Sequence, residues 1–126
     1  ELIDWIRDER IGGVVFVSGD RHLSELMRWE PDWGYPFYEF TASPVANRFF
    51  ATGLELPNPI RVWGYGASAN YGLLEVDTTV PEGRITFVVK DVEGREIHRH
   101  STSMDALEFD GFVDDKAIPA RPGGTP

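Results

Sequence analysis

The chain has 126 residues, of which 41% are hydrophobic and 13% aromatic, so it can bury a core as one domain. Its formal net charge of −9 argues against a surface that attracts nucleic acid or an anionic membrane. It has no cysteine, which excludes disulfides, thiolate nucleophiles and zinc–cysteine clusters. A membrane-spanning helix needs roughly 20 apolar residues. The apolar runs here are far shorter, so we expect no membrane span.

The first ten residues predict an amphipathic helix, because Leu2, Trp5 and Ile6 recur at helical spacing and a pair of glycines follows. Residues 14–17 are all apolar and mostly β-branched, which predicts a buried strand covered on both faces. A helix, a glycine turn and a buried strand form the second half of a βαβ unit. We therefore expect the first strand of that unit upstream, and the chain to be a fragment of a larger domain.

The rest of the chain predicts mainly β-structure. Residues 37–41 predict a strand, whereas residues 42–70, with several prolines and glycines, predict a long irregular loop. An antiparallel meander follows, with strands over 73–78, 84–91 and 96–103 and Gly-containing turns between them. Residues 1–110 are expected to belong to one domain, and residues 111–126, rich in Pro and Gly, to form a disordered tail.

The segment Ser18-Gly19-Asp20-Arg21-His22 directly follows the first predicted strand. Its carboxylate and imidazole, two residues apart, can bind one metal ion or two adjacent ions. This ligand pair suits iron, zinc, manganese or, through the carboxylate, calcium. A rigid strand end holds such ligands in place while the loop stays open to substrate. Taken alone, however, a Gly-Asp-x-His sequence is more often a surface turn with an Asx hydrogen bond.

The context of this turn carries a family resemblance. The turn is followed by Thr41-Ala42-Ser43-Pro44, then by Asn70-Tyr71-Gly72, and then by the closing hairpin. This order, over about residues 1–107, resembles the C-terminal part of the PhoD-like alkaline phosphatase family, within the calcineurin-like metallophosphoesterases. The resemblance implies an α/β fold, the C-terminal part of a four-layer αββα sandwich. In it, one buried strand follows a helix and precedes an antiparallel β-meander. It also implies a hydrolase that uses two or more metal ions to cleave phosphate monoesters or diesters.

Residue roles follow from the resemblance. Asp20 and His22 match the two ligand positions of the family's last metal-binding motif, so they would be catalytic metal ligands. The family's earlier ligands lie upstream, so the rest of its own catalytic domain would complete the site. Arg21 could contact a phosphate oxygen of the substrate, although strand-like alternation would point it away from its neighbours. Family members are often exported, and the sequence does not predict a location.

Four further polar residues are weighed against structural roles. Glu25 and Ser24 could hydrogen-bond to a metal ligand, and a helix-start role for Ser24 is equally compatible with the sequence. Asn70 could line the cleft and bind substrate, although a turn-forming asparagine is the more ordinary interpretation. Ser43 has no His or acid at useful spacing and is not predicted to be a nucleophile.

His98 and His100 alternate on one predicted strand and share a face. Two such imidazoles can bind a metal, but the intervening Arg99 and the nearby Glu96 favour a solvated strand face.

Two alternatives of other classes stay open. The density of Trp and Tyr between residues 29 and 71 suits a β-rich module that binds a carbohydrate or a peptide without catalysis. The meander could also be a purely structural packing element. In a fragment it would have lost its partner sheet and would expose apolar strand faces.

Overall fold

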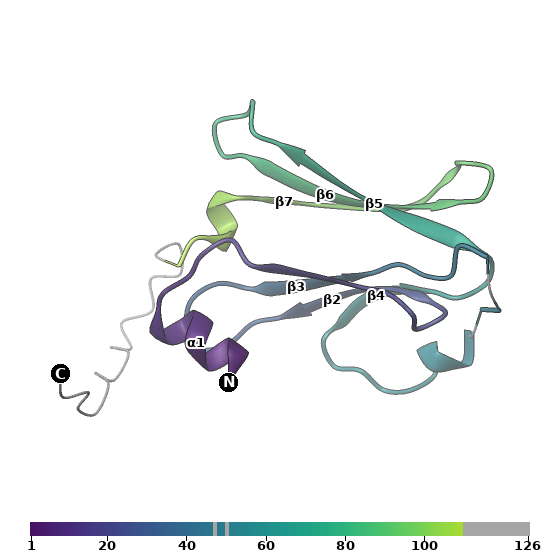
Figure 1. Cartoon of the computed structure of the whole chain (residues 1–126), viewed down its shortest axis with the longest axis horizontal. Coiled ribbons are helices and arrows are strands. Elements are labelled where there is room, and N and C mark those ends of the chain that lie inside the picture. The colour runs from purple at the N-terminus through teal and green to yellow at the C-terminus, as the bar shows by residue number, and fades with distance from the viewer. Residues whose placement is uncertain (47, 50, 110–126) are drawn as a thin grey trace.

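The computed structural model describes residues 1–46, 48–49 and 51–109. Two β-sheets pack face to face, and an α-helix lies beside one of them (Figure 1). The elements in chain order are α1 (Leu2–Asp8), β1 (Val15–Ser18), β2 (Ser24–Trp29), β3 (Phe37–Thr41), a 3₁₀ turn η1 (Ala51–Leu54), β4 (Arg61–Tyr65), β5 (Asn70–Asp77), β6 (Arg84–Asp91), β7 (Glu96–Ser103) and a 3₁₀ turn η2 (Asp105–Leu107).

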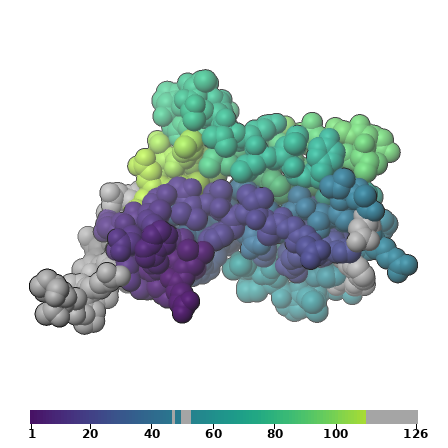
Figure 2. Space-filling view, viewed as in Figure 1, coloured from purple at the N-terminus to yellow at the C-terminus, as the bar shows by residue number. Residues whose placement is uncertain are grey.

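The first sheet has the strand order β1-β3-β2-β4, and the second has the order β5-β6-β7. In the first sheet β1 runs parallel to β3, whereas β2 is antiparallel to both β3 and β4. The second sheet is the predicted antiparallel meander, which is thereby confirmed, although β5 begins at Asn70 instead of residue 73. In the space-filling view the meander forms one layer, which lies directly on the chain segments of the first sheet (Figure 2).

The predicted α/β four-layer αββα sandwich is wrong for this chain. Strands account for 42% of the structure and helices for 11%, and α1, of seven residues, is the one α-helix among the described residues. The reason lies in two strands that the sequence did not predict. Ser24 opens strand β2 instead of a helix, and the region read as an irregular loop contains β4. Both strands extend the first sheet, so the described part of the chain consists of two sheets without helical layers.

The predicted helix and the strand after it are confirmed as elements, but they are less buried than expected. Within α1, Ile6 is buried whereas Leu2 and Trp5 are exposed. Strand β1 lies at the edge of its sheet, and its side chain Val17 is 69% exposed. The cause is topological: the chain places β2 on the far side of β3, so β1 has a strand neighbour on one side alone among the described residues.

The core lies between the two sheets. The ring of Phe40 on β3 stacks on that of Phe87 on β6, with centroids 4.9 Å apart and planes 17° apart. Leu26 and Val89 are fully buried beside them. The meander therefore has a partner sheet within this chain, and the expectation that in a fragment it would have lost that sheet is wrong.

The surface interpretation of His98 and His100 is also wrong. Both side chains are half-buried on the face of β7 that points toward the first sheet. His98 stacks on Trp63 with centroids 4.1 Å apart, and His100 packs against Tyr38 at 5.3 Å. Arg99 points to the opposite side, because neighbouring residues of a strand face opposite ways. The charge of Arg99 therefore says nothing about the solvent exposure of the two histidines, which lie on the other face of the strand.

Two remaining expectations concern the ends of the chain and the membrane. The predicted tail, residues 111–126, lies outside the described residues. Over the part of the chain that the structure describes, no helix is both long and apolar enough to cross a bilayer.

Replacing Phe87 by Ala tests the contact between the sheets. Phe87 is 3% exposed, and deleting its ring leaves a cavity against Phe40. We expect a loss of about 3–5 kcal/mol in the free energy of unfolding, measured by urea denaturation. The control Val92→Ala removes a side chain that is 60% exposed in the β6–β7 turn, and it should change stability by less than about 0.5 kcal/mol. Equal effects would show that the two sheets do not share this core.

The two histidines predict a dependence of stability on pH. Burial lowers the pKa of both imidazoles, and the neighbouring charges of His100 on His98, and of Arg28 on His100, lower the pKa further. The unfolded chain therefore binds more protons than the folded chain as the pH falls through about 6.5. The free energy of unfolding should therefore be highest above about pH 6.5 and should fall progressively below it.

Thermal denaturation between pH 7.5 and 5.5 measures this effect, with His98→Phe/His100→Phe as the comparison. The double variant retains aromatic packing without a titrating group, so its melting temperature should change less with pH than that of the wild type. The same slope in both proteins would contradict the assignment.

Candidate functional site

The Gly19–His22 turn follows the edge strand β1 and has an unusual backbone. Asp20 has a φ angle of 60° and His22 one of 59°, both in the left-handed region. This region is uncommon for residues other than glycine, and surrounding contacts must offset a cost of roughly 1–3 kcal/mol for each. Asp20 is exposed and His22 is half-buried. Such strain in a polar turn is a feature that clusters at functional sites.

His22 is held in place by two hydrogen bonds to other segments. Its backbone N–H donates to Ser43 Oγ at 2.8 Å, and its ring Nδ1 contacts the backbone carbonyl of Arg48. A carbonyl oxygen can only accept, so Nδ1 must carry the proton in this contact. Histidines that bind metals commonly donate one ring N–H to a carbonyl in this way.

A buried polar cluster lies beneath the turn, and it joins three segments that are distant in the sequence. Ser24 Oγ donates to Asn70 Oδ1, and the backbone N–H of Ser43 donates to Ser24 Oγ at 3.2 Å. Asn70 Nδ2 donates to the carbonyls of Ser68 at 2.9 Å and Ser43 at 3.4 Å. Ser24 and Asn70 are fully buried. The cluster therefore fixes Ser43, whose hydroxyl in turn accepts the His22 N–H.

These contacts decide the structural alternatives for Ser24 and Asn70. Asn70 is not a surface turn residue: it is the first residue of β5, and its side chain has partners on both its oxygen and its nitrogen. It lies beneath the turn. Ser24 opens β2, so the helix-start role is wrong.

Glu25 is the other buried polar group close to the turn. Its side chain is fully buried and is bonded to two arginines: Arg21 Nη1 donates to Oε2 at 2.8 Å, and Arg61 Nε donates to Oε1 at 2.8 Å. Arg61 also donates to the backbone carbonyls of Gly53, Leu54 and Leu56, so it anchors the loop around η1. Glu25 thus contacts the turn through Arg21, which it holds against the first sheet.

Asp20 and His22 are the two predicted metal ligands. They offer a carboxylate and an imidazole nitrogen in one turn, which are suitable donors for iron, zinc or manganese. Within residues 1–46, 48–49 and 51–109 there is no group of three or more His, Cys, Asp or Glu side chains that could hold a metal ion. A complete site would therefore need donors beyond those that the described residues bring together.

The sequence pointed to the turn but not to the residues that hold it. Ser43 was considered only as a nucleophile, and its observed role is to anchor His22. Arg61 and Arg48 carried no local signal, because they act on residues 36 and 26 positions away. The Ser-Pro and Asn-Tyr-Gly segments, which carried the family resemblance, did point to part of this support, since Ser43 and Asn70 both belong to the buried polar cluster.

The predicted aromatic residues divide into two groups. Tyr35, Phe37 and Tyr38 are buried, whereas Trp29 is 37% exposed. The module that binds a carbohydrate or a peptide stays a prediction.

No protein-family model matches the chain, and neither the curated proteins nor the solved structures contain a match. The family resemblance therefore stays a prediction from the sequence.

Substituting Glu25 by Gln tests the buried ion pair. The change leaves the guanidinium of Arg61, whose side chain is 15% exposed, without its charged partner. Breaking a buried pair in this way is expected to cost about 3–5 kcal/mol of unfolding free energy, measured by chemical denaturation. The matched control is Glu96→Gln, since Glu96 pairs with Arg99 on the surface and its loss should have little effect. A Glu25 variant as stable as the control would contradict a structural role for the pair.

Proposed function

We propose that this chain contributes Asp20 and His22, as metal ligands, to an enzyme that hydrolyses phosphate monoesters or diesters with metal ions. Under this proposal the chain belongs to the PhoD-like phosphatases, and the remaining ligands come from the rest of its own catalytic domain. The metals would be two or more ions of iron, zinc, manganese or calcium.

One observation carries the proposal. The three segments behind the sequence resemblance, which are up to about 50 residues apart, meet at one end of the two sheets. The Gly-Asp-x-His turn is hydrogen-bonded to Ser43 of the Thr-x-Ser-Pro segment. Ser43 in turn is hydrogen-bonded to Asn70 of the Asn-Tyr-Gly segment. A simple surface turn with an Asx hydrogen bond needs neither of these partners.

The geometry of the turn adds two points of support. The contact of His22 Nδ1 with the Arg48 carbonyl orients the imidazole, as a carbonyl partner does for many histidines that bind metals. The left-handed backbone at both Asp20 and His22 is kept at an energetic cost, and such strain clusters at functional sites.

Bound metal ions would lower the pKa of a coordinated water and stabilise charge on the phosphoryl oxygens. The chain's own residues hold and orient the site. Ser43 and Asn70 position the turn, and Glu25 holds the guanidinium of Arg21 beside it. Arg21, whose side chain is 44% exposed, is the proposed contact to a substrate phosphate. Asn70 is buried and its side chain is bonded, so we assign it to positioning and not to substrate contact.

Glycine substitutions test the ligand assignment with little strain, since glycine tolerates the left-handed backbone. In the intact protein, Asp20→Gly and His22→Gly should each reduce bound metal, measured by elemental analysis. Hydrolysis of nitrophenyl phosphate and bis-nitrophenyl phosphate should fall by about 100-fold or more, because even loss of a residue that only orients a ligand typically costs 10–100-fold.

The matched control is Arg10→Gly, which places glycine at another left-handed residue, one that follows α1 and precedes β1. It should retain metal and activity. A wild-type protein without bound metal and without activity toward either ester would overturn the proposal, as would full activity in both ligand variants.

A further inference from the structure

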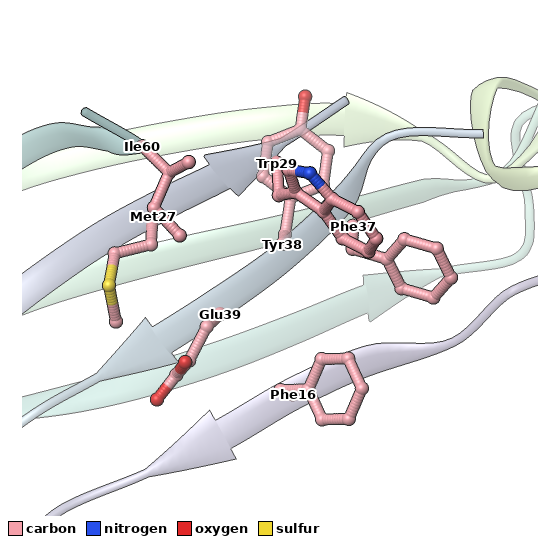
Figure 3. A pocket seen from close by; sticks show the side chains of 7 residues that line it. All are labelled: Phe16, Met27, Trp29, Phe37, Tyr38, Glu39 and Ile60. Carbon is pink, nitrogen blue, oxygen red and sulfur yellow. The ribbon is translucent and has the colours of Figure 1, made fainter. Parts of the chain in front are cut away.

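A second candidate site lies on the outer face of the first sheet. Residues that are directly opposite in register share a face, so Phe16, Glu39 and Met27 lie together there, as do Phe37 and Trp29. Phe40, which packs on the second sheet, points the other way. A hollow of about 160 Å³ opens on this outer face (Figure 3).

The hollow is lined mainly by aromatic rings. Trp29 stacks on Phe37 with ring centroids 5.7 Å apart, and Phe16 lies 6.1 Å from Phe37 at a tilt of 34°. Met27 and Ile60 line the hollow as well. Trp29 is 37% exposed, so part of its ring is open to solvent at the rim.

One charged group belongs to this lining. Glu39 is half-buried, and its Oε1 accepts a hydrogen bond from Ser18 Oγ at 2.7 Å. Figure 3 shows its carboxylate between the side chains of Met27 and Phe16. The hollow therefore places one negative charge among polarizable and aromatic groups.

This combination selects the ligand by charge. Aromatic faces and a carboxylate both attract a cation, and both repel an anion such as a phosphate. A sugar would need several convergent hydrogen-bonding partners, whereas Glu39 is the one charged side chain of the lining and the Tyr38 hydroxyl is already bonded to Arg28. Its size fits a compact head group and not a drug-sized molecule. We propose that this hollow, which Tyr38 lines together with the residues named above, binds a small alkylated ammonium ion.

The proposal does not rest on the phosphoesterase function. The hollow extends from Glu39 toward the end of the sheet where β2 ends at Trp29 and β3 begins at Phe37, whereas the Asp20–His22 turn follows β1 at the opposite end. The net charge of −9 also favours cations over anions in the surrounding field.

Calorimetric titration of the intact protein with choline tests this site. We expect saturable binding that is about fivefold or more tighter than that of 3,3-dimethylbutanol, which has the same shape without the charge. The indole N–H resonance of Trp29, identified by its loss in Trp29→Phe, should shift with choline and locate the site.

The decisive variant is Glu39→Gln, which keeps the size of the side chain and an acceptor for Ser18. It should weaken choline binding about fivefold or more, whereas Glu75→Gln on the outer face of the second sheet should bind as the wild type does. Circular dichroism checks that both variants are folded. Equal binding of choline and the alcohol, no saturable binding, or an unchanged affinity in a folded Glu39→Gln variant would each overturn the proposal.

Discussion

Ser24 and Asn70 have polar side chains without access to solvent, and such groups must find hydrogen-bonding partners inside the protein. They find each other, and both also bond to the backbone of Ser43. Ser24 begins a strand of the first sheet, and Asn70 begins a strand of the second. This cluster therefore fixes how the two sheets meet at the end where the Asp20–His22 turn lies. An apolar substitute on either side would leave the remaining partner unsatisfied.

The turn depends on this cluster for its shape. Its two left-handed residues would relax in an isolated peptide, because nothing there would offset their strain. In the protein, the Ser43 hydroxyl holds the His22 amide, and Arg21 is held by the buried Glu25. The outer-face hollow is independent of these contacts except for Ser18, which precedes the turn and bonds to Glu39.

The sequence predicted those parts of the molecule that are determined by neighbouring residues. The meander was predictable because its turns contain glycine and because Ile85, Phe87 and Val89 alternate with residues of the outer face. Strand β2 was not predictable in this way. It carries a buried glutamate, which is stabilised by an arginine 36 residues later in the sequence.

The candidate site follows the same division. Asp20 and His22 were predicted from a five-residue pattern, whereas the anchoring role of Ser43 arises from a contact across 21 residues. The overall architecture was mispredicted because it was inferred from the family resemblance. The chain itself forms two sheets and one short helix in the region described.

Asn70, which helps to hold the turn, belongs to a strand that is synthesised much later than the turn, and this order matters during synthesis on the ribosome. Asp20 and His22 leave the exit tunnel about 50 residues before Asn70, and earlier still than β6, the strand that pairs with β5. The turn of a nascent chain would then be complete in sequence but not yet shaped, because Ser43 lacks its bond to Asn70 until the meander docks. The native shape of the turn would therefore form only after the meander has been synthesised and has docked on the first sheet.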